Sequence, residues 1–209
     1  MNTQGLVGNM LYLADGDYGA RNESLPAMSL SLWLQYMLDN YATVDELAAD
    51  LYDSNGDIKY QVRTKEVIPG VPSLQHLSIG DATGDNIILE WINGTLVSHH
   101  SKDYTTSAIG NTAGMIRAVS VPNEPSGIDT PNISPTLWRT YSDTLDKTYF
   151  WESATDAFFF WINLEDFNLS NNGTIMKLPL MNVDWQDRVG NMGANFENST
   201  SFTFLECDN

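Results

Sequence analysis

The stretch NIILEWINGTLVSHH, residues 86–100, decides the fold of this chain. At its centre stands Asn93-Gly94, a strong signal for a two-residue hairpin, because a type I′ turn needs positive φ at both central residues. Short apolar runs lie on both sides of this turn and before it, at residues 74–79, 86–92 and 95–99. The sequence therefore predicts a three-stranded antiparallel meander. Consecutive apolar residues within 86–92 indicate a sheet covered on both faces.

Two helices are predicted on the N-terminal side of the meander. Apolar residues recur at the spacing of one helical face at Leu30, Trp33, Leu34, Met37, Leu38 and Tyr41. A second, shorter helix follows, because Thr43 and Glu46 stand at the spacing of a capping box. We expect the two helices to cover one side of the sheet.

Further strands are predicted at both ends of the chain. An apolar run at 5–13 begins close to the first residue, and further strands are expected at 137–142, 148–153, 157–163 and 201–205. A third helix is expected near 112–119. Antiparallel sheets with helices outside them define an α+β fold.

Length and charge narrow the class of protein. The 209 residues suit a single domain, and 27 acidic against 10 basic residues give a net charge of −17. This balance argues against nucleic acid as a partner, since phosphate binding needs a basic surface. No apolar run reaches the roughly 20 residues of a membrane-spanning helix. A single cysteine, Cys207, excludes a disulfide framework.

Two motifs suggest metal sites, but in each the spacing of the residues argues against metal binding. The segment starting at Asp53 resembles a calcium loop, but positions 6 and 12 hold Ile58 and Thr64 instead of Gly and Glu. His99 and His100 are adjacent, so on a strand they point to opposite faces. We expect no metal and no other cofactor. Cys207 lies between two acidic residues, which disfavours a reactive thiolate.

Five segments, taken in order, carry a resemblance that no single motif provides. They are MNTQGL at 1–6 with LYL at 11–13; SLSLWLQYMLDNYATVDE at 29–46; LSIGDATGD at 77–85 with EWING at 90–94; IRAVSVP at 116–122 with PNIS at 131–134 and WRT at 138–140; and YFWES at 149–153 with FWINL at 160–164. Together they resemble the choloylglycine hydrolase family, specifically its penicillin V acylase-like branch.

This resemblance implies an N-terminal-nucleophile hydrolase with an αββα sandwich of antiparallel sheets and outer helices. Such enzymes cleave linear amides with an N-terminal cysteine, whose own α-amino group acts as the base. Hydrogen-bond donors stabilise the oxyanion. The resemblance implies no metal and no organic cofactor.

The family's catalytic residues do not carry over to this chain. The nucleophilic cysteine precedes the MNTQGL segment in the family and is absent here, and Cys207 has no free α-amino group. The family's Thr-Asn-Ser-Pro motif is missing near residues 105–111. Tyr12 falls where penicillin V acylases carry a tyrosine beside the oxyanion site, so it is the one substrate-site residue that the resemblance supplies. We expect one domain over 1–209, incomplete in these two places.

The expected function is hydrolysis of a linear amide such as penicillin V, a bile salt or an N-acyl homoserine lactone. Because the cysteine is missing, we expect this chain as given to be inactive and leave its enzymatic activity open. The alternative is a non-catalytic remnant or an acyl-ligand-binding module of the same fold. The partner is a small-molecule amide or acyl ligand, and the family allows a homo-oligomer. Localisation is open, with export expected if the missing front carried a signal peptide.

Overall fold

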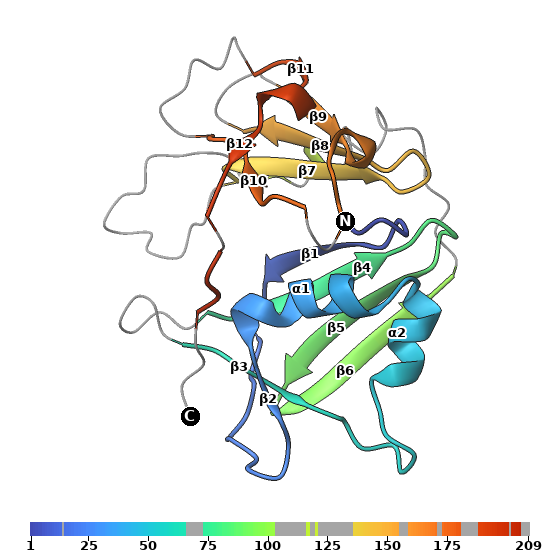
Figure 1. Ribbon diagram of the computed structural model, residues 1–209. Helices are drawn as coiled ribbons and strands as arrows, with labels where there is room; N and C mark the ends of the chain where they lie inside the picture. Colours follow the sequence, from blue (N-terminus) through green and yellow to red (C-terminus); the bar gives the residue numbers. More distant parts are fainter. Residues whose placement is uncertain are drawn as a thin grey trace. The chain divides into compact units, whose positions relative to one another are not determined.

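Figure 1 shows the computed structural model of the chain. It describes residues 1–13, 15–65, 73–102, 116–117, 120, 136–154, 159–170, 173–180, 188–200 and 202–205. The chain divides into two compact units, Met1–Thr105 with Phe202–Asn209 and Thr106–Ser201, and each is described by itself. No helix in the described residues is long and apolar enough to cross a membrane.

The first unit contains a four-stranded antiparallel sheet in the order β1-β4-β5-β6. Its strands are β1 (Val7–Tyr12), β4 (Gln75–Gly80), β5 (Asn86–Ile92) and β6 (Thr95–Ser101). Asn93 and Gly94 form the β5–β6 turn with φ of 49° and 73°, as a type I′ hairpin requires. The predicted meander is therefore confirmed, and β1 extends it by one strand.

Two helices pack on one face of this sheet (Figure 1). They are α1 (Leu30–Asn40) and α2 (Val44–Asp50). The short strand β2 (Ala27–Ser29) leads into α1 and pairs in parallel with β3 (Gln61–Arg63), which follows α2. Thr43 caps α2 by accepting a hydrogen bond from the Glu46 backbone N–H at 3.2 Å. Both predicted helices are confirmed. Their core residues and those of the sheet are buried together, namely Trp33, Met37, Val44, Leu47, Leu77, Ile79, Ile87, Leu89 and Trp91.

The second unit contains another four-stranded sheet, in the order β11-β9-β8-β7. Its strands are β7 (Trp138–Asp143), β8 (Thr148–Ser153), β9 (Phe159–Asn163) and β11 (Gly190–Asn191). Short elements follow β9: η1 (Leu164–Asp166), η3 (Gly193–Asn195), and the paired β10 (Met176–Lys177) and β12 (Glu197–Asn198). The predicted hairpin of β7 and β8 is confirmed.

The predicted closing strand at 201–205 is wrong. Residues 202–205 form no strand. The rings of Phe202 and Phe204 contact each other edge to face, with their centroids 4.9 Å apart. The Leu205 carbonyl accepts a hydrogen bond from the Ser29 hydroxyl at 2.6 Å. Alternating apolar residues make a strand only where a neighbouring strand bonds to their backbone. Of the helix expected near 112–119, only Ile116 and Arg117 lie within the described residues, and both are helical.

A close backbone contact docks the loop after β1 onto the β5–β6 hairpin. Gly19 has φ +69°, and a Cβ built on it would lie 2.5 Å from the Gly94 Cα. Two backbone hydrogen bonds accompany this contact, from Asp17 to Trp91 at 2.8 Å and from Gly94 to Asp17 at 3.0 Å. The loop therefore requires glycine at position 19 for two reasons, its left-handed backbone and the lack of space.

Substituting Gly19 tests this docking, with Gly56 as the matched control. Gly56 also has positive φ, +85°, but nothing lies within 4 Å of its added Cβ. Gly56→Ala should lower the free energy of unfolding by about 1–2 kcal/mol, because only the left-handed backbone is penalised. Gly19→Ala should lower the free energy of unfolding by a further ~1–3 kcal/mol, because the new Cβ clashes with the Gly94 backbone. Urea unfolding measures both, and equal losses would contradict the contact.

Candidate functional site

Tyr12 ends β1 and stands opposite Gln75 in the register of the sheet. Tyr12 is 68% exposed, and its hydroxyl makes no hydrogen bond to another residue in the described part of the chain. The next residue, Leu13, stays attached to the sheet, because its backbone N–H donates to the Leu74 carbonyl at 3.0 Å. A phenol held on a strand end, with a hydroxyl that no described residue engages, is available to a ligand.

Two hollows adjoin this end of the sheet. The larger, of about 300 Å³, contains the Tyr12 register partner and is lined by Met10, Ser29, Leu30, Ser31, Thr64, Lys65, Ser73, Gln75 and Leu205. The smaller, of about 190 Å³, is lined by Gly16, Asp17, Tyr18, Gly19, Arg63, Thr64 and Leu74. Thr64 lines both, so the hollows are neighbours.

The wall of the smaller hollow is held by a dense set of hydrogen bonds. The Tyr18 hydroxyl accepts from the Gln75 backbone N–H at 2.9 Å and lies 3.2 Å from the Gln75 carbonyl. Burial raises the pKa of Tyr18, against a smaller opposing effect of the Gln75 backbone. The Gln61 amide donates to the carbonyls of Tyr18 at 3.1 Å and Ala20 at 2.7 Å. Such a wall presents its groups in a fixed arrangement.

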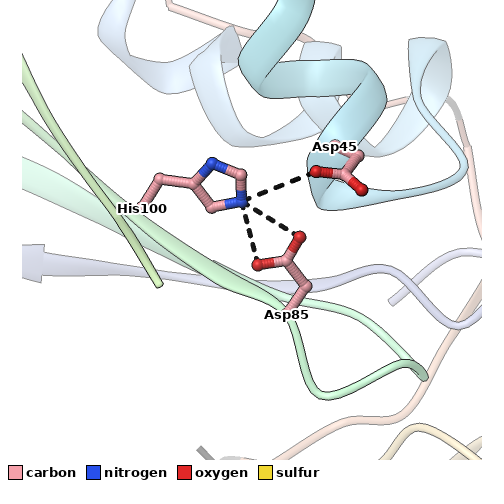
Figure 2. A group of neighbouring side chains, drawn as sticks. All are labelled: Asp45, Asp85 and His100. Atoms are coloured by element: carbon pink, nitrogen blue, oxygen red, sulfur yellow. Dashed lines mark hydrogen bonds and ion pairs between the residues drawn. The ribbon is translucent and has the colours of Figure 1, made fainter. Parts of the chain in front are cut away.

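A polar cluster joins α2 to the sheet on the same unit (Figure 2). His100 on β6 places Nε2 2.9 and 3.0 Å from the two carboxylate oxygens of Asp85, and 3.9 Å from Asp45 at the start of α2. The Asp85 carboxylate is only 2% exposed, whereas that of Asp45 is 63% exposed. The Lys102 ammonium lies 2.6 Å from Asp45 and 3.6 Å from Asp85.

This cluster has the side-chain types of a metal site, since one ligand atom from each of Asp45, Asp85 and His100 lies within 4.8 Å of the others. Lys102 already supplies a cation to both carboxylates. A second buried aspartate of the same turn, Asp81, accepts from the Val44 backbone N–H at 2.8 Å. The turn before β5 therefore fastens the start of α2 to the sheet, and we assign the cluster this structural role.

The other motifs of the sequence are placed as follows. His99 lies 3.3 Å from Glu90 whereas His100 faces Asp85, which confirms that the adjacent histidines point to opposite faces. The Asp53 carboxylate accepts backbone hydrogen bonds from Asn55 at 2.8 Å and Asp57 at 3.0 Å, which lower its pKa. Cys207 lies outside the described residues.

The second unit holds a separate charge cluster around Glu152. This carboxylate accepts from Arg117 Nε at 2.8 Å and from the Tyr141 hydroxyl, and Arg139 lies 3.6 Å away. Burial by itself raises the pKa of Glu152, but the hydrogen bonds from Arg117 and Tyr141 outweigh it, so the net shift is downward. Burial, with Glu152 as a lesser cause, raises the pKa of Tyr141 to about 12. The Glu152 carboxylate is therefore buried and satisfied from several sides, while its partner Arg117 is half-exposed.

The sequence did not reveal either cluster. Asp85 and His100 come together because β5 and β6 pair in a register that sets Asn86 opposite Ser101. That register follows from the Asn93-Gly94 turn. Counting residue pairs outward from the turn along β5 and β6 would therefore have predicted that Asp85 and His100 lie close together. No comparable signal linked Arg117 to Glu152.

Comparisons with known proteins identify the class. The profile described as linear amide C–N hydrolases, choloylglycine hydrolase family, matches residues 1–109. A penicillin V acylase of Pectobacterium atrosepticum is 29% identical over 274 residues, covering 98% of this chain and 72% of that protein. The aligned length exceeds the 209 residues of this chain, so the acylase has residues within the aligned region that have no counterpart here.

Solved structures similar to this chain include another penicillin V acylase. Penicillin V acylase from Agrobacterium tumefaciens superposes with a TM-score of 0.76 at 30% identity, covering 98% of this chain and 78% of that one. A conjugated bile acid hydrolase from Clostridium perfringens, 13% identical with a TM-score of 0.56 over 88% and 79% of the two chains, shows likeness of fold alone.

The fold class is thus the α+β fold of the N-terminal-nucleophile hydrolases, as predicted. Within that class, the chain belongs to the choloylglycine hydrolase family of linear amide C–N hydrolases.

Removing the buried carboxylate of the α2 cluster should destabilise the protein. Asp85→Ala leaves His100 and Lys102 without their buried partner and should lower the free energy of unfolding by about 1.5–3 kcal/mol. Asp45→Ala removes an exposed carboxylate from the same cluster and should cost about 1 kcal/mol or less. The comparison is made by urea unfolding, and an equal loss in both variants would argue against the burial of Asp85.

Glu152 should make a pH-dependent contribution to stability. Because the folded state lowers its pKa from the ordinary value of 4.5, the contribution is present above pH 4.5 and is lost as the pH falls through the folded-state pKa. Glu152→Gln should therefore cost about 1.5–3 kcal/mol at neutral pH and progressively less below about pH 4.5. Unfolding of both proteins is compared across this range. A difference that stays constant with pH would contradict the ion pair.

Proposed function

We propose that the protein is a linear amide hydrolase of the penicillin V acylase type, with the scissile amide placed at the exposed end of β1. The observation that carries this proposal is the position of Tyr12. It is largely exposed, and it lies beside a hollow of about 300 Å³ lined by its register partner Gln75. The likeness to a penicillin V acylase over 98% of the chain supports the substrate class.

The reaction adds water across the C–N bond of the amide and yields a carboxylic acid and an amine. Negative charge develops on the carbonyl oxygen as the tetrahedral intermediate forms, so a donor aimed at that oxygen lowers the barrier. We assign this role to the Tyr12 hydroxyl. Family membership implies a cysteine nucleophile whose own α-amino group takes the proton.

A second function, binding an acyl ligand without turnover, is favoured by a different observation. The 209 residues contain a single cysteine, Cys207, which cannot present a free α-amino group inside the chain. If the mature protein does not begin with cysteine, the scaffold and Tyr12 would recognise an amide but would have no covalent route to cleave it.

The deciding experiment uses the protein purified from its own source, with its intact mass and N-terminal residue determined. It is incubated with penicillin V, and release of 6-aminopenicillanic acid is measured together with binding by calorimetry. Release supports the hydrolase. Binding without release supports the acyl-binding module. Neither binding nor release would overturn both.

Tyr12→Phe should then lower kcat by about 100-fold, because it removes one donor to the oxyanion and leaves the ring in place. Tyr36→Phe on α1, away from both hollows, is the matched control and should leave kcat unchanged. In a protein that only binds, Tyr12→Phe is followed as weaker binding of penicillin V. An unchanged kcat and an unchanged affinity would remove Tyr12 from the site.

A further inference from the structure

Arg63, the last residue of β3, carries a charge that the described residues leave uncompensated. Its side chain is half-buried, and one terminal nitrogen donates to the Gly19 carbonyl at 2.6 Å. Its Nε–H is buried and has no hydrogen-bond partner among the described residues. No carboxylate in the described part of the chain forms an ion pair with this guanidinium.

This is unexpected in a chain with 27 acidic residues. Three other arginines have carboxylate partners: Arg21 lies 3.8 Å from Glu23, and Arg117 and Arg139 lie 2.8 and 3.6 Å from Glu152. Arg188 in the second unit, like Arg63, has a buried Nε with no hydrogen-bond partner among the described residues. Taking a charged group out of water is costly unless it is paired. A half-buried guanidinium whose buried Nε–H is unpaired is therefore a preformed partner for an anion.

The surroundings of Arg63 form a site of suitable size. Arg63 lines the 190 Å³ hollow, whose wall at Tyr18 and Gly19 is held by the hydrogen bonds described above. Asp17 also lines the hollow, but one of its carboxylate oxygens is engaged by the Gly19 backbone N–H at 2.8 Å. The guanidinium is thus positioned in advance, and its planar fork matches the geometry of a carboxylate.

The place of this hollow relative to Tyr12 indicates which part of a ligand it would hold. Leu74, which lines it, precedes the register partner of Tyr12, and Thr64 is shared with the hollow beside that partner. A ligand with its amide at Tyr12 could extend a nearby carboxylate into the smaller hollow.

We propose that Arg63 is the anchor of a carboxylate-binding subsite. The position of the ligand at Tyr12 rests on the proposed function, but the anion site itself does not. Two sources share this chemistry: a carboxylate on the amine half of the amide, as in penicillin V, and the carboxylate of the released acid, as in phenoxyacetate.

The test is calorimetric titration with penicillin V, its methyl ester and phenoxyacetate. The ester removes the charge of the amine half and keeps the amide. It should bind wild type at least about tenfold more weakly than penicillin V, as expected for losing a charge-assisted contact. Arg63→Gln should weaken binding of the acid to the level of the ester and should bind acid and ester equally. Arg63→Lys should keep part of the preference for penicillin V over its methyl ester.

Arg21→Gln is the matched control, since it removes one positive charge from the same unit outside the hollow and should keep the wild-type preference for the acid. If the protein cleaves penicillin V, the same comparison is made on KM. Weaker binding of phenoxyacetate to Arg63→Gln than to wild type would instead place the released acid in the hollow.

The subsite is overturned if wild type binds penicillin V and its ester equally and phenoxyacetate does not respond to Arg63→Gln. It is also overturned if neither acid binds. Amide hydrolysis that continues with no preference for the acid would leave the proposed function standing without the subsite. Binding of phenoxyacetate through Arg63 without binding of penicillin V would leave the subsite standing and would count against the proposed function.

Discussion

The contact between Gly19 and Gly94 sets the geometry on which the site depends. Two backbones can approach this closely only where neither residue has a Cβ. The approach docks the loop after β1 onto the β5–β6 hairpin and brings the Gly19 carbonyl within 2.6 Å of Arg63. The hollow, its guanidinium and the end of β1 are therefore organised by one close approach of main chain to main chain.

Beneath that contact lies an ordinary apolar core. Trp33 and Met37 of α1 are buried in the same core cluster as the alternate residues Ile87, Leu89 and Trp91 of β5. Burial of large side chains supplies the stability, at roughly 1.5–3 kcal/mol for each side chain fully removed from water. The polar cluster of Asp85, His100 and Lys102 then determines where α2 begins on the sheet. Packing thus stabilises the unit, and buried hydrogen bonds specify its arrangement.

Charge is distributed unevenly over this acidic chain. The few cations are mostly neutralised, as Arg117 is by Glu152 and Lys102 by Asp45. Arg63 differs because its guanidinium donates to the Gly19 carbonyl and forms no ion pair within the described residues. We have proposed amide chemistry at the neighbouring strand end, where Tyr12 ends β1. Under that proposal, Arg63, which forms no ion pair within the described residues, would bind the charged part of the substrate.

The sequence alone determined the local elements and the family. The Asn93-Gly94 turn, the apolar spacing of 30–41 and the Thr43 cap are local rules, so the meander and both helices were predictable. The order of the matching segments pointed to the choloylglycine hydrolases and to Tyr12. The strand expected at 201–205 failed because a strand needs a partner edge, and the pattern of one segment does not contain its partner. Likewise, the pairing of His100 with Asp85, of Arg117 with Glu152, and of Arg63 with the Gly19 carbonyl were decided only by the tertiary structure. They join residues distant in sequence, and which charges meet depends on register and packing.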